Sequence, residues 1–141
     1  MPALTLAQAR TVIDAALAAA RQQGFKPMAV VVVDGAAQVV ASAREDGASA
    51  LRLDIALGKA AAAVGMGSNS RLLAHRAKDL PAFFGAIASV AQQKFVPQTG
   101  AVLITDADGT VLGAAGASGG TGDEDEQICI AGIAAAGLTH A

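Results

Sequence analysis

The chain has no tryptophan, no tyrosine and only one cysteine, and its basic residues form no cluster. Without Trp and Tyr it lacks the aromatic surfaces on which nucleic-acid bases stack, and its formal net charge of −2 offers no positive surface to a phosphate backbone. The lone Cys129 excludes an intrachain disulfide and a cysteine metal cluster. We therefore expect no nucleic-acid partner, and this cysteine usage fits a reducing, cytoplasmic location.

Long hydrophobic runs free of charge are also missing. A membrane span needs about 18 consecutive apolar residues, whereas Arg10, Asp14 and Arg21 interrupt the Ala-rich N-terminal stretch at helical spacing. That pattern is typical of an amphipathic helix, so we expect no membrane association. A length of 141 residues suits one domain, and we predict that residues 1–141 form it.

Small apolar residues are abundant. Hydrophobic residues make up 53% of the chain and charged residues only 16%, with Ala the dominant apolar type. Such a composition leaves a surface poor in charge, which a small monomer would expose to water. It therefore favours self-association, and we expect a homo-oligomer.

Capping and turn signals give the expected order of elements. Thr5 with Gln8, and Thr121 with Glu124, form capping boxes at the starts of two helices. Two Asp-Gly-containing turns join β-branched runs and predict two hairpins. The expected strands are 28–33, 38–43, 101–105 and 111–117, and the expected helices are 5–24, 51–64, 70–77, 82–93 and 122–136. This order predicts an α/β fold of the α+β type, with an antiparallel sheet and helices packed on it.

A glycine-rich turn precedes the last helix. Ser118, Gly119 and Gly120 lie just before the Thr121 cap, where glycine permits positive φ and lets a ligand approach the main chain. The turn is either a ligand-binding corner or only a strand-to-helix connection. Three carboxylates in the first helical turn, at residues 123–125, would repel a phosphate. We therefore expect no nucleotide here, but a neutral ligand, or an anion held by a basic residue elsewhere.

Lys59 stands in an otherwise apolar helical run, residues 55–64. A lysine there either reaches solvent or is buried beside a carboxylate. If it is buried, it is a candidate acid, base or amine nucleophile.

Arginines gather where the second expected strand ends. Arg44 and Asp46 lie at that end and Arg52 at the start of the next helix, so the two arginines could hold a carboxylate bidentately. The alternative is a surface ion pair between Arg44 and an acidic neighbour.

His75 is the histidine that we consider as a ligand, since His140 lies next to the end of the chain. Basic neighbours disfavour protonation of its imidazole, and a neutral imidazole can ligate a metal or act as a base. The alternative is a plain surface histidine. The sequence offers no second histidine at metal-ligand spacing, so we predict no metal site of its own. Cys129, between two isoleucines, is expected to be a core residue.

Three stretches carry a family resemblance: residues 30–47, residues 54–60 and residues 113–125. In order, they contain an Asp-Gly pair after an arginine, a Lys-Ala pair in a helix, and Ser-Gly-Gly-Thr before an acidic helix start. Together they resemble the GlcG/HbpS family (DUF336). The resemblance implies a profilin-like fold, a homo-oligomer between tetramer and octamer, and a small-molecule ligand, with haem or a related tetrapyrrole as the cofactor. It also implies Asp125 as the partner of Lys59. The chain departs from the family pattern at Ala37 and at Thr99-Gly100, where the family often has glycine.

Three hypotheses follow from these features. The first is a small-molecule-binding accessory protein with a pocket between the last hairpin, the Ser118 turn and the Lys59 helix, and with His75 as a candidate haem ligand. The second is a cofactorless isomerase or lyase acting on a small carboxylate, with Lys59 and Asp125 moving the proton. The third is an assembly module without a ligand. We expect one concavity to hold these candidate residues: Lys59, Arg44, Arg52, Ser118, Gly119, Gly120 and Asp125.

Overall fold

Capping residues set the start of the first and last helices. The structure, a computed structural model, describes residues 3–141. Helix α1 (Leu6–Gln23) begins after Thr5 and helix α5 (Gly122–Ala135) after Thr121, each with a complete capping box. Gly24 ends α1 with a φ of 71°, a left-handed conformation that glycine adopts without a steric cost. Both predicted capping boxes are confirmed.

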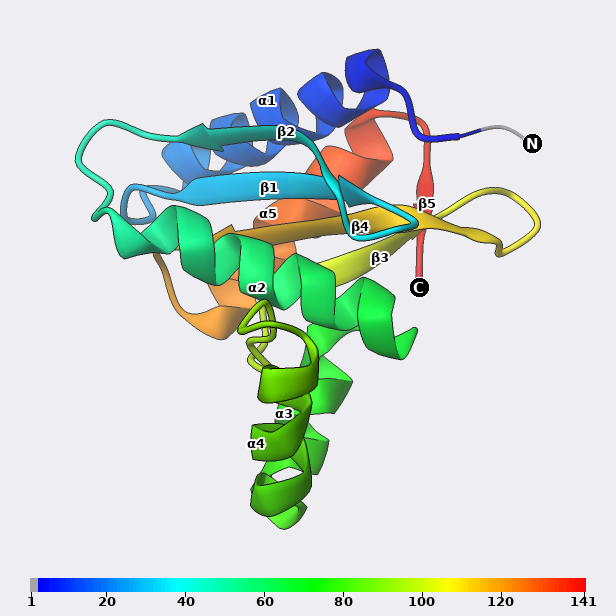
Figure 1. Ribbon diagram of the computed structural model, residues 1–141. Coiled ribbons are helices and arrows are strands. Elements are labelled where there is room, and N and C mark those ends of the chain that lie inside the picture. The colour runs from blue at the N-terminus through cyan, green and yellow to red at the C-terminus, as the bar shows by residue number, and fades with distance from the viewer. Residues whose placement is uncertain (1–2) are drawn as a thin grey trace.

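Residues 3–141 fold into one antiparallel sheet with five helices (Figure 1). The strand order is β2-β1-β4-β3-β5, so both predicted hairpins are present and lie side by side. The α/β class of the α+β type is therefore confirmed. The remaining elements are β1 (Ala29–Asp34), β2 (Val39–Arg44), α2 (Leu51–Met66), α3 (Ser70–Asp79), α4 (Pro81–Val90), β3 (Ala101–Thr105), β4 (Val111–Ser118) and β5 (Thr139–His140).

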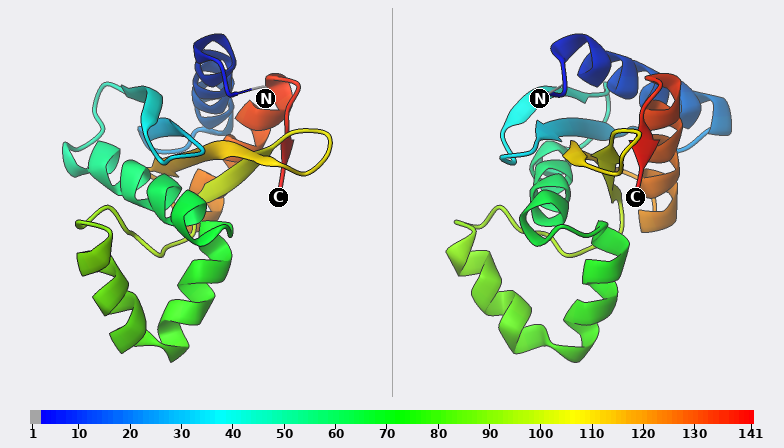
Figure 2. Two further views of the ribbon diagram at one scale, coloured as in Figure 1. Left: turned by 45° about the vertical axis from the view of Figure 1, so that its right-hand side comes forward. Right: turned by 90° about the vertical axis from the view of Figure 1, so that its right-hand side faces the viewer.

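The sheet separates two hydrophobic cores, as alternation of side chains along each strand requires. Val30 and Val32 face helices α1 and α5, whereas Val31 and Val33 face helix α2. Figure 2 shows the resulting layers, with α2 on one side of the sheet and α1 with α5 on the other. Four consecutive valines, Val30–Val33, form the middle of β1, and a continuous β-branched run of this kind is typical of a strand that is buried on both faces.

Glycines allow the layers to approach closely. A Cβ at Gly116 of β4 would lie 2.5 Å from the carbonyl oxygen of Ala56, in helix α2. A Cβ at Gly132 of α5 would lie 2.3 Å from the carbonyl oxygen of Val12, in α1. The abundance of small residues therefore serves packing within the chain as well as any contact between chains.

Helices α3 and α4 form an arm that projects beyond the sheet (Figures 1 and 2). Its base is a small core of Leu73, Phe84 and Phe95. The predicted helix 82–93 extended too far: α4 ends at Val90, because Gln92 and Gln93 adopt left-handed φ values of 55° and 68° that cannot continue a right-handed helix.

Strand β5 is absent from the sequence prediction. Its two residues pair with the edge of β3, with His140 opposite Ile104, and the Thr139 hydroxyl donates to the carbonyl oxygen of Thr105 at 3.0 Å. Two residues are too few to show a periodicity, so the sequence carries no strand signal there. The pairing fixes His140 against the domain.

Within residues 3–141, no helix combines the length and the apolar character needed to cross a bilayer.

Candidate functional site

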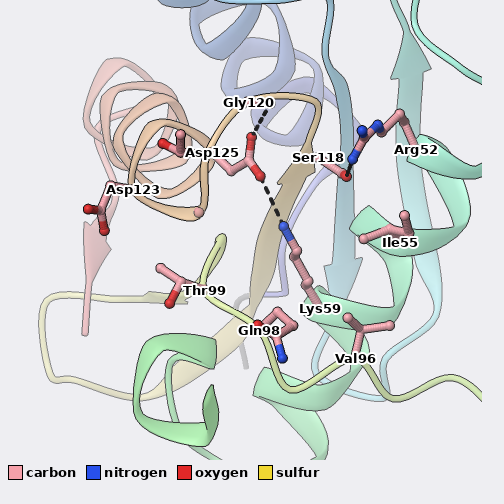
Figure 3. A pocket seen from close by; sticks show the side chains of 12 residues that line it. Arg52, Ile55, Lys59, Val96, Gln98, Thr99, Ser118, Gly120, Asp123 and Asp125 are labelled. Atoms are coloured by element: carbon pink, nitrogen blue, oxygen red, sulfur yellow. Dashed lines mark hydrogen bonds and ion pairs between the residues drawn. The ribbon is translucent and has the colours of Figure 1, made fainter. Parts of the chain in front are cut away.

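A hollow of about 460 Å³ opens where the end of β4, the start of α5, helix α2 and the segment before β3 meet (Figure 3). We call it the Lys59 hollow. The volume lies in the range of small-molecule sites. Its lining residues are Arg52, Ile55, Lys59, Val96, Gln98, Thr99, Ser118, Gly120, Thr121, Gly122, Asp123 and Asp125.

Lys59 lies on the face of α2 that packs on the sheet and is only 5% exposed. Its ammonium donates to the Asp125 carboxylate, with Nζ and Oδ2 3.0 Å apart, and to the Ala117 carbonyl oxygen, also at 3.0 Å. A side chain at Gly100 would exclude this ammonium, because a Cβ there would lie 2.7 Å from Nζ. Lys59 is therefore buried beside a carboxylate and does not reach solvent.

Both oxygens of Asp125 accept hydrogen bonds. Oδ2 receives the Lys59 ammonium, and Oδ1 receives the Gly120 backbone N–H at 2.9 Å. Asp125 is 1% exposed, and this burial raises the pKa of its carboxyl group. The charge of Lys59 and its hydrogen bond lower that pKa and counteract part of the rise. The pair thus ties helix α2 to the turn before α5.

Arg52 and Ser118 form the other polar part of the hollow. Arg52, in the first turn of α2, donates from Nη1 to Ser118 Oγ at 3.3 Å, and Ser118 is 1% exposed (Figure 3). Thr99 lines the same hollow. The sequence-predicted residues Lys59, Arg52, Ser118, Gly120 and Asp125 therefore share one concavity.

Gly119 and Gly120 are required by the packing of the chain on itself. Gly119 has a φ of 152°, and a Cβ there would lie 2.2 Å from the carbonyl oxygen of Pro27. A Cβ at Gly120 would lie 2.9 Å from the terminal methyl of Met28 and 2.6 Å from a carboxylate oxygen of Glu124. Protein atoms therefore occupy the positions that side chains at these glycines would take. The sequence predicted instead that these glycines let a ligand approach the main chain. Gly119 lines an adjoining hollow that shares Arg52 and Gly120 with the first.

Arg44 and Asp46 do not line the Lys59 hollow. They line a separate one with Arg21, Pro27 and Glu45. The Arg44 guanidinium donates to the carbonyl oxygen of Ala48 at 2.6 Å and so holds the loop after β2. The expectation that Arg44 joins the other site residues is thus corrected: Arg44 is the last residue of the edge strand β2, and its side chain bonds the loop that follows this strand.

A second hollow of about 460 Å³ contains both histidines of the chain. We call it the histidine hollow. His75 comes from α3 and His140 from β5, and the apolar residues that line the same hollow are Leu72, Val102 and Ile130. His140 was not expected to contribute, since it lies next to the end of the sequence, but the pairing of β5 with β3 brings it to the same hollow as His75.

An ion-pair network separates the two hollows. Arg71 of α3 donates from Nη2 to a carboxylate oxygen of Asp123. It also donates to Glu126, from Nε to Oε2 at 3.1 Å and from Nη2 to Oε1 at 3.0 Å. Asp123 lines the Lys59 hollow, whereas Arg71 and Glu126 line the histidine hollow. Arg71 therefore neutralises acidic residues at the start of α5.

Cys129 is fully buried in α5. Burial raises the pKa of its thiol, which keeps it protonated and unreactive. Among residues 3–141, no group of three or more His, Cys, Asp or Glu side chains is arranged to hold a metal ion.

Comparisons with known proteins give one family and several solved structures. The family model described as haem degrading protein HbpS-like matches residues 4–134. No curated protein sequence matches the chain.

PduOC and HbpS are among the similar solved structures, at 28% to 30% sequence identity. The crystal structure of the PduOC:Heme complex is 28% identical, with 98% of each chain covered and a TM-score of 0.86. A double mutant of HbpS from Streptomyces reticuli is 30% identical, with 95% of this chain and 87% of that one covered and a TM-score of 0.83.

A third similar structure supports the fold alone. Klebsiella pneumoniae protein ORFY, assigned to DUF336, is 24% identical over 95% of this chain and 90% of that one, with a TM-score of 0.84. The family model covers nearly the full length described here, and the structures agree with it in architecture. The chain belongs to the HbpS-like family.

Proposed function

We propose that this protein is a haem-binding accessory protein that holds haem in the histidine hollow. Membership of a family described as haem degrading, and similarity to PduOC, whose structure is a complex with haem, support haem as the ligand. The choice of the hollow rests on the chemistry of its lining residues.

Haem iron is held in proteins by His, Cys, Met or Tyr side chains. The Lys59 hollow offers none of these types, and its charged and amide side chains do not suit a large apolar ring. The sequence-based pocket for haem, between the Ser118 turn and the Lys59 helix, is therefore unsuited to the ligand that the family suggests.

The histidine hollow fits the group better, and this observation carries the proposal. His75 and His140 are both exposed and both line it, so each can present an imidazole nitrogen to an iron atom. Leu72, Val102 and Ile130 supply an apolar wall for the porphyrin face. A bound haem would supply a redox-active iron; the residues of this chain would hold it and limit the access of water.

The direct test is a titration of the protein with haemin, followed by the Soret absorption. We expect saturation at one haem per chain with a shifted Soret band. His75→Ala and His140→Ala are each expected to weaken haem binding or to change the position of the Soret band. The double variant should show neither saturable binding nor the shifted Soret band. Because the two side chains are exposed, their truncation should leave the fold intact, which circular dichroism checks.

Lys78→Ala provides a matched control, since Lys78 is also exposed on α3 and does not line the hollow. Its titration should match that of the unmodified protein. Unchanged affinity and spectrum in the double histidine variant would overturn the proposed site, and no saturable binding by the unmodified protein would overturn the proposed function.

A further inference from the structure

The charges around the Lys59 hollow leave one cation without a partner. Asp125 is paired with Lys59, and Asp123 with Arg71. Within residues 3–141, Arg52 has no carboxylate at ion-pair distance, although it is half-buried. A half-buried guanidinium that lines a hollow and lacks a counter-ion favours an anionic ligand, and one free positive charge matches a monoanion.

Hydrogen-bond donors with no acceptor point to the same kind of ligand. Arg52 carries five N–H groups, and one of them is used on Ser118 Oγ. The Ser118 hydroxyl is 1% exposed and accepts from Arg52, but its own hydrogen has no acceptor within residues 3–141. A carboxylate between these two groups would accept from both of them.

Neighbouring side chains define the rest of the ligand. Ile55 and Val96 form a short apolar wall, which fits a few carbon atoms. Gln98 and Thr99 also line the hollow, and both have polar side chains. Such side chains can form a hydrogen bond with a hydroxyl or keto oxygen on the ligand. Figure 3 shows both residues on the same side of the hollow as the Lys59 side chain.

From these observations we infer that the Lys59 hollow binds a small monocarboxylate bearing a hydroxyl or keto oxygen, with Arg52 and Ser118 holding its carboxylate. This site is separate from the histidine hollow and does not depend on haem. A dianion such as phosphate is disfavoured, because within residues 3–141 Lys59 and Arg71 already pair with Asp125 and Asp123, which leaves only the charge of Arg52 for the ligand.

Isothermal titration calorimetry with three probes tests the inference on the full chain. Lactate carries both a carboxylate and a hydroxyl. Propionate keeps the carboxylate but lacks the hydroxyl, and propionamide lacks both the hydroxyl and the negative charge. We expect saturable one-to-one binding of lactate, weaker binding of propionate and no binding of propionamide. Arg52→Gln should weaken lactate binding about tenfold or more, since a charge-assisted hydrogen bond is lost.

Two further variants keep the test decisive. Ser118→Ala removes only a hydroxyl and should also weaken lactate binding, so it gives the answer if Arg52→Gln does not fold. Arg10→Gln, on the exposed side of α1 and away from the lining of this hollow, is the matched control and should bind lactate normally.

Haemin titration of the Arg52 variant distinguishes this inference from the proposed function, because that variant should keep its haem binding. Absence of saturable lactate binding would overturn the carboxylate site. Equal binding of propionamide, or unchanged lactate binding in both the Arg52 and the Ser118 variant, would overturn it as well.

Discussion

Replacing Lys59 by Met is the perturbation whose cost follows most directly from the structure. Met keeps much of the apolar stem but removes the ammonium, which donates to Asp125 Oδ2 and to the Ala117 carbonyl oxygen at 3.0 Å each. Asp125, 1% exposed, would keep only the Gly120 N–H. Breaking a buried ion pair on one side costs about 3–5 kcal/mol. Because the pair borders an open hollow, we expect a loss near the lower limit, about 3 kcal/mol at neutral pH.

The pH dependence of that loss provides a second check. Burial raises the pKa of Asp125 and Lys59 lowers it, so the variant should have a pKa above that of the unmodified protein. A carboxyl group whose folded-state pKa is raised stabilises the fold most below its unfolded pKa of about 3.9, and this contribution is lost as pH rises through the folded-state pKa. The gap between variant and unmodified protein should therefore be small near pH 4 and widen toward neutral pH.

Urea denaturation at one fixed protein concentration measures both effects. A double variant, Lys59→Met with Asp125→Leu, should recover most of the loss, because replacing both charges with apolar groups removes the unpaired carboxylate. A single-variant cost below about 1 kcal/mol at neutral pH, or the same cost at both pH values, would show that the pair does not behave as a buried one.

Four further predictions follow. Ala37 has a φ of 61°, so Ala37→Gly should relieve backbone strain and raise the free energy of unfolding by about 0.5–1 kcal/mol; a lower denaturation midpoint would contradict this. Gly119→Ala should destabilise more than Gly109→Ala, since an added Cβ meets a backbone oxygen only at the former; equal midpoints would be the wrong result. Cys129 should react slowly with iodoacetamide in the native state even at mildly alkaline pH, because burial raises its pKa, and stability should fall once the unfolded thiol ionises above about pH 8.5; rapid native labelling would count against this. Light scattering at micromolar concentration should give a species larger than a dimer, given the exposed apolar side chains of α3 and α4, and a clean monomer would refute that expectation.

Local signals predicted most of the fold. The capping boxes at Thr5 and Thr121 and the Asp-Gly turns depend on neighbouring residues only, so the sequence contains all the information that they need. The end of α4 was missed because the residues that adopt left-handed φ there, Gln92 and Gln93, are not glycines. Strand β5 was missed because it depends on pairing with the distant edge of β3.

For the candidate site too, local sequence signals were predictive, whereas contacts between distant segments were not. Lys59 was recognised because a lysine in an apolar run needs an acceptor, and the structure supplies Asp125 from 66 positions away. The role of Gly119 was harder to predict, because the atoms that exclude a side chain there come from Pro27, before β1. The signal that could have found His140 is the short Thr-His segment after α5, which becomes informative only once the neighbouring β3 edge is known.

The location of haem in crystals of the haemin complex tests the central claim most directly. Anomalous diffraction at the iron absorption edge gives the iron position without a prior choice of site. We predict an iron peak in the histidine hollow, within coordination distance of a ring nitrogen of His75 or His140. An iron peak in the Lys59 hollow, or at a surface that neither histidine reaches, would contradict the account.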